Sequence, residues 1–89
     1  MHAIVTVIGR DQVGIIADVC TRLSSHNINV LDISQTILQG YFTMIMLVDT
    51  AGCDLSFDEL SRELHEAGAA RQLSIRIQRE DIFNSMHRI

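Results

Sequence analysis

Two segments of this chain, residues 2–8 (HAIVTVI) and 41–49 (YFTMIMLVD), carry apolar side chains on both of their alternating faces. Their β-branched and aromatic residues favour strands. A strand that is apolar on both faces must be covered on both sides. We therefore expect these two segments to be the central strands of one sheet.

Two other segments have the periodicity of amphipathic helices. The first runs from Gly14 to about Ser25 and places one set of residues on one face: Ile15, Ile16, Val19, Cys20 and Leu23. The second begins with Ser56 and Glu59, the pattern of a capping box. Its apolar stripe contains Phe57, Leu60, Leu64 and Ala67. Gly68 follows where a left-handed residue would end the helix.

Residues 28–38 and 73–78 complete the pattern as two further strands, the second with one polar face. The order β-α-β-β-α-β predicts an α+β, ferredoxin-like βαββαβ sandwich: a four-stranded antiparallel sheet with both helices on one face. Right-handed crossovers would place segments 2–8 and 41–49 in the middle of the sheet.

The second face of such a sheet needs a cover, because Ile4, Ile8, Met44 and Met46, or their alternates, must line it. Residues 80–89 are a candidate, since their apolar residues have the spacing of a short amphipathic helix. We expect residues 1–79 to form the domain and residues 80–89 a tail that docks on its own sheet or on a second copy. The expected interface residues are Met44, Met46, Ile82, Phe83 and Met86.

The sequence VIGRDQVGII joins the first strand to the first helix, and its two glycines have the spacing of a phosphate-binding loop. A P-loop requires a lysine after the second glycine, but Ile15 follows Gly14 and the chain contains no lysine. The dinucleotide fingerprint fails because Asp11 replaces its second glycine. What remains is a turn that suits a small carboxylate, with Asp11 as a helix cap. Alternatively, Gly14 serves only close packing.

The run GRDQVGIIADVCTRLSSHNINVLDISQT resembles the signature half of an ACT domain. It has a strand, an aspartate three residues before a glycine, a helix, and an asparagine-hydrophobic pair that opens the second strand. The chain also resembles small single-ACT-domain proteins akin to the ACT modules of the glycine cleavage regulator. The ending IFNSMHRI is similar to the tail of that family.

This resemblance implies a regulatory module that binds an amino acid or similar small effector at the interface of a homodimer. It places the ligand loop at Asp11, Gln12, Val13 and Gly14, and a further ligand residue at Asn29. Val13 stands where amino-acid-binding relatives carry proline. A structural role for Asn29 as a cap is an equal alternative.

Charge and composition argue against other functions. The formal charge of −4, with seven arginines against eleven acidic residues, disfavours nucleic acid and anionic membranes. The four histidines lack metal-ligand spacing, and no catalytic pairing is evident, so we expect neither a cofactor nor enzymatic activity. The two cysteines form no CxxC motif, and no apolar run is long enough to span a bilayer. We therefore expect a cytoplasmic protein. The alternative to a ligand sensor is a ligand-free dimerisation or protein-interaction module, acting on a partner enzyme or regulator.

Overall fold

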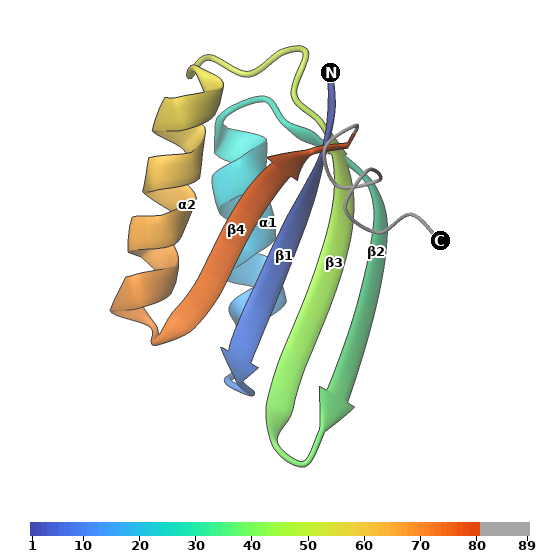
Figure 1. Cartoon of the computed structure of the whole chain (residues 1–89), viewed down its shortest axis with the longest axis vertical. Helices are drawn as coiled ribbons and strands as arrows, with labels where there is room; N and C mark the ends of the chain where they lie inside the picture. Colours follow the sequence, from blue (N-terminus) through green and yellow to red (C-terminus); the bar gives the residue numbers. More distant parts are fainter. Residues whose placement is uncertain (81–89) are drawn as a thin grey trace.

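Six elements follow one another in residues 1–80, the residues that the computed structural model describes. They are β1 (His2–Arg10), α1 (Ile15–Ser25), β2 (Asn29–Leu38), β3 (Tyr41–Asp49), α2 (Phe57–Ala70) and β4 (Leu73–Arg79). The predicted βαββαβ order is confirmed, and both helices lie behind one face of the sheet (Figure 1). The expected tail residues Ile82, Phe83 and Met86 lie outside the described residues, so their place in an interface stays a prediction.

The four strands form one antiparallel sheet in the order β2-β3-β1-β4. The two strands that are apolar on both faces are therefore the central ones, as expected. β2 and β4 form the edges of this sheet, and β2 is the edge farther from α2 in Figure 1.

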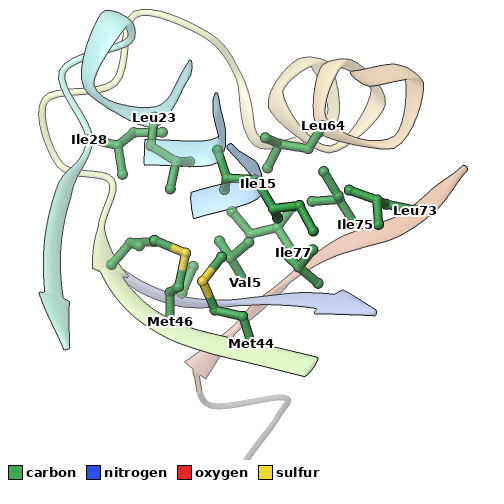
Figure 2. Close-up of a cluster of buried hydrophobic side chains, with 14 of the residues drawn as sticks. Val5, Ile15, Leu23, Ile28, Met44, Met46, Leu64, Leu73, Ile75 and Ile77 are labelled. Atoms are coloured by element: carbon green, nitrogen blue, oxygen red, sulfur yellow. The ribbon is translucent and has the colours of Figure 1, made fainter. Parts of the chain in front are cut away.

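The core lies between the sheet and the helices, and both expected interface methionines belong to it (Figure 2). Met46 stands opposite Val5 and Met44 opposite Val7, and both methionine side chains are 0% exposed. The prediction that these two residues lie on the uncovered face is wrong. Strand alternation places their neighbour Ile45 there instead.

Among the described residues, the face of the sheet opposite the helices exposes large apolar side chains. Ile8 is 48% exposed and Ile45 41% exposed. At one end of this face, the Arg10 guanidinium lies 5.6 Å from the centre of the Tyr41 ring. The apolar residues that β3 places on this face are therefore different from those expected, and the partner of this face stays a prediction.

The start of α2 has the predicted capping box. The Glu59 backbone amide donates to Ser56 Oγ over 3.2 Å, and the Ser56 amide donates to Glu59 Oε1 over 3.1 Å. The helix does not end at Gly68, however, but continues to Ala70. Gly68 is buried where α2 crosses β4, and a Cβ atom there would lie 2.7 Å from the Leu73 carbonyl oxygen. Close packing, not chain reversal, explains this glycine.

The edge strand β2 contains an irregularity between Val30 and Asp32. After it, Gln35 pairs with Met44 and Ile37 pairs with Phe42, whose side chains face the helices. Gln35 and Ile37 therefore lie on the helix side of the sheet. They remain exposed because the helices do not cover this end of β2.

Candidate functional site

The turn between β1 and α1 is held by a backbone hydrogen bond at its start and ends in a left-handed residue. The Asp11 amide donates to the Gly40 carbonyl over 2.9 Å, which joins the turn to the β2–β3 hairpin. Gly14 is the N-cap of α1 and has a φ of 85°, a left-handed value that favours glycine. No side chain caps the helix here, so the predicted cap at Asp11 is not formed.

A cavity of about 190 Å³ opens beside this turn. One wall is formed by the β1–α1 loop and the first residues of α1. The other wall is formed by the hairpin end of β2 and β3. The lining residues are Asp11, Gln12, residues 14–17, Gln35, Ile37 and Phe42. Apolar and polar groups thus converge on one small hollow, as is typical of a small-molecule site.

The polar groups around the cavity favour a ligand that carries both charges. The first backbone amides of a helix have no acceptor within the helix, and those of α1 also lack a side-chain cap. They give this end of the cavity a partial positive charge. Asp11 is exposed at the same turn and supplies a carboxylate. Asp18 is paired with Arg22 (3.2 Å) and Arg71 (3.3 Å).

Arg71, in the turn between α2 and β4, holds the loop from the other side. Its Nη2 atom donates to the Val13 carbonyl over 2.9 Å, and its Nη1 atom donates to the Gly14 carbonyl over 3.3 Å. In return, Gln12 Nε2 donates to the Arg71 carbonyl over 2.7 Å. Arg71 could not be identified from the sequence, because no local pattern links residues more than fifty positions apart.

The structure brings together only some of the expected ligand residues. Asp11, Gln12 and Gly14 line the cavity, whereas the Val13 side chain is 98% exposed and does not. Asn29 pairs with Asp49 at the opposite end of the sheet from the loop. Within one chain, Asn29 therefore cannot contribute to this cavity. Gln35 and Ile37 were missed, although their alternation along β2 carried the signal.

Elsewhere, residues 1–80 form a further hollow and lack a cluster of metal-ligating side chains. No group of three or more metal-ligating side chains is present in this part of the chain. A more open groove of about 420 Å³ runs between α2 and β4 and includes Arg62 and Arg76. Among the described residues, no helix is long and apolar enough to cross a membrane.

Comparison with known protein families decides the relationship that the fold indicates. The profile of the ACT domain family matches residues 1–78. The chain belongs to the ACT domain family. The matched residues therefore include both helices and all four strands, except the last residue of β4.

Individual relatives extend this result. The ACT domain is 58% identical over 87 residues to a UPF0237 protein of Bifidobacterium longum, with 98% of this chain and 97% of that protein covered. Among solved structures, it is similar to an ACT domain protein from Streptococcus pneumoniae, with a TM-score of 0.82, 38% identity and 93% of both chains covered.

A more distant structural likeness concerns a putative glycine cleavage system transcriptional repressor. Its TM-score is 0.73 at 20% identity, over 86% of this chain and 44% of that chain. At this identity the likeness shows that the two proteins share the ACT fold.

Proposed function

We propose that this ACT domain is a regulatory module that binds an amino acid or a similar small effector and changes the behaviour of a partner protein. The observation that supports this most directly is the cavity at residues 11–17 and β2. There an uncapped helix start, an exposed carboxylate and apolar walls meet. Membership of the ACT family supports the same class of function.

The chemistry of the cavity fits a zwitterion. An α-carboxylate would accept hydrogen bonds from the free amides at the start of α1. The ammonium group would pair with the Asp11 carboxylate. The amide of Gln35 offers both a donor and an acceptor, and Ile37 and Phe42 supply apolar contacts for a side chain.

A second copy of the chain would complete the site through β2. The described part of β2 has one neighbour, β3, so its other edge can pair with another strand. Antiparallel pairing of two β2 strands places the start of one strand beside the end of the other. Asn29 of one copy would then lie at the loop end of the second copy, where a ligand could contact both.

Regulation requires that such a dimer can adopt two arrangements, and that these bind the effector with different affinities. A ligand shifts a conformational equilibrium only by the difference between its affinities for the two states. An effector that bridges the loop of one copy and β2 of the other would stabilise one dimer geometry. The partner protein would read that geometry as a change in the surface presented to it.

Thermal unfolding at fixed protein concentration tests the proposal. The protein is heated with each of the twenty amino acids, and with small carboxylates, at millimolar concentration. A ligand at about 100 times its Kd stabilises the native state by about 2.7 kcal/mol, a shift of several degrees for a domain of this size. We expect one compound or a small group to give such a shift in the wild type.

Variants then assign the shift to the cavity. Gly14→Ala and Gln35→Leu should abolish it, whereas Val13→Ala should not, because that side chain points away from the cavity. The loss of response in Asn29→Ala would support a shared site in the dimer. The absence of a shift with every compound would contradict the sensing function.

A second candidate function is a ligand-free interaction module, and the exposed apolar face of the sheet favours it. Ile8 and Ile45 lie on this face, and exposed patches of this kind mark binding surfaces on small domains. Ile45→Ser would then abolish partner binding or self-association, while Gly14→Ala would leave both unchanged. The reverse result would favour the sensor.

A further inference from the structure

We infer that Arg71 is a positioning residue for the ligand loop, and that it sets which way the backbone amides of that loop point. The inference rests on the proposed function for its consequence in binding. The contacts that carry it are those of one guanidinium with two successive carbonyl groups of the loop, Val13 and Gly14.

The orientation follows from peptide geometry. The described peptide bonds are all trans, so the carbonyl of one residue and the amide of the next point in opposite directions across one plane. Since the Val13 carbonyl faces Arg71, the Gly14 amide faces away from it. The Gly14 carbonyl also accepts from Arg71 and from the Asp18 amide at 2.9 Å, so the Ile15 amide points away as well.

The guanidinium is itself held in place. Arg71 Nη1 lies 3.3 Å from Asp18 Oδ2 on α1, and Asp18 Oδ1 accepts from Arg22 Nε over 3.2 Å. The Asp18 carboxylate thus compensates the charge of Arg71 and fixes its plane. A planar fork can reach three acceptors on two elements at once, whereas the ammonium group of a lysine is a compact point charge.

The contact is also reciprocal, because the Arg71 carbonyl accepts from Gln12 Nε2. The loop is therefore fastened to the α2–β4 turn on both sides of Val13. This arrangement explains how a loop with an uncapped helix start and a left-handed Gly14 can keep one conformation without a side-chain cap. The amides at the cavity are then oriented before a ligand arrives, which lowers the entropic cost of binding.

Two variants of Arg71 and one matched control test this role. Arg71→Met removes the charge and the fork, and Arg71→Lys keeps the charge alone. Arg76→Met removes an exposed arginine of β4 that lines the groove on the far side of the domain. Backbone ¹⁵N relaxation of residues 12–15 reports the order of the loop without any ligand, and circular dichroism confirms that each variant is folded.

We expect both Arg71 variants to increase the mobility of residues 12–15, and Arg76→Met to leave it unchanged. For the compound selected by thermal unfolding, the Kd should rise by about tenfold or more in Arg71→Met, and by less in Arg71→Lys. The inference would be overturned if residues 12–15 of folded Arg71→Met were as ordered as in the wild type. It would also be overturned if the loop of Arg71→Met became mobile but the Kd of the compound stayed the same.

The failure of the proposed function gives a different result. If no compound binds the wild type, the sensing role is contradicted while the relaxation data still decide whether Arg71 orders the loop. If Arg71→Met does not fold, Arg71→Lys serves for both measurements.

Discussion

His26 Nε2 lies 2.6 Å from Glu63 Oε2, a contact that joins the end of α1 to α2. On its other side, His26 Nδ1 lies 2.8 Å from Asp54 Oδ1. A neutral imidazole has only one N–H group, so both contacts are hydrogen bonds to carboxylates only when the ring is protonated. The hydrogen bond with Asp54 is the main cause that raises the pKa of His26 above 6.5, with the charge of Glu63 in support.

The stability of the domain should therefore depend on pH through His26. A pKa that is raised in the folded state stabilises the protein below the unfolded value of 6.5, and this contribution is lost as pH rises through the folded value. The thermal stabilities of wild type and His26→Gln should differ most below pH 6.5 and converge as the pH rises above the folded-state pKa of His26. The exposed His65→Gln is the control. An NMR titration that gives His26 a pKa at or below 6.5 would contradict this account.

Met46 and Ile45 are neighbours on β3 that face opposite sides of the sheet, and their truncation should have different costs. Met46→Ala leaves a cavity in the core and should reduce the free energy of unfolding by about 2–5 kcal/mol. Ile45→Ala removes a side chain that is already 41% exposed and should cost less. Urea denaturation measures both. If both variants lost the same free energy of unfolding at every protein concentration, so that no second copy buries Ile45, the assigned faces would be contradicted.

Gly68→Ala should destabilise the domain although alanine favours helices. The added methyl group would lie 2.7 Å from the Leu73 carbonyl oxygen and 2.9 Å from Ile75 Cγ1. We expect a loss of about 1–3 kcal/mol from this overpacking, measured by urea denaturation. A gain of about 1 kcal/mol, as helix propensity alone predicts, would show that α2 does not approach β4 so closely.

Gly14 and Gly40 form a matched pair, with φ values of 85° and 81° and no neighbouring atom that crowds an added methyl group. Gly14→Ala and Gly40→Ala should each cost about 1–2 kcal/mol of stability through the left-handed backbone. Only Gly14→Ala should also abolish the effector response, because Gly40 does not line the cavity. If both variants lose the response equally, backbone strain and not the cavity determines binding.

The sequence predicted most of the fold because strong local signals define its elements. The strand at residues 41–49 and the capping box at Ser56 and Glu59 were both confirmed. The face of Met44 and Met46 could not be read locally, since Ile45 and Leu47 on the alternate positions are equally apolar. Only the register opposite Val5 and Val7 decides it.

The candidate site was predicted in part for the same reason. The loop residues Asp11, Gln12 and Gly14 are close in sequence and share the cavity, so a local motif could identify them. Gln35 reaches the cavity through strand pairing, and Arg71 reaches the loop through the packing of the α2–β4 turn. Alternation along β2 indicates that Gln35 and Ile37 share a face, but no sequence spacing shows that this face meets the loop, and none links Arg71 to the loop.

The proposed function requires that the cavity beside the β1–α1 turn binds a small zwitterionic effector. An NMR titration of the ¹⁵N-labelled protein with the twenty amino acids, pooled and then separate, tests it most directly. We expect amide shifts concentrated at residues 11–17, Gln35 and Ile37. Shifts confined to the exposed apolar face of the sheet around Ile8 and Ile45, or no shifts with any amino acid, would contradict binding in this cavity.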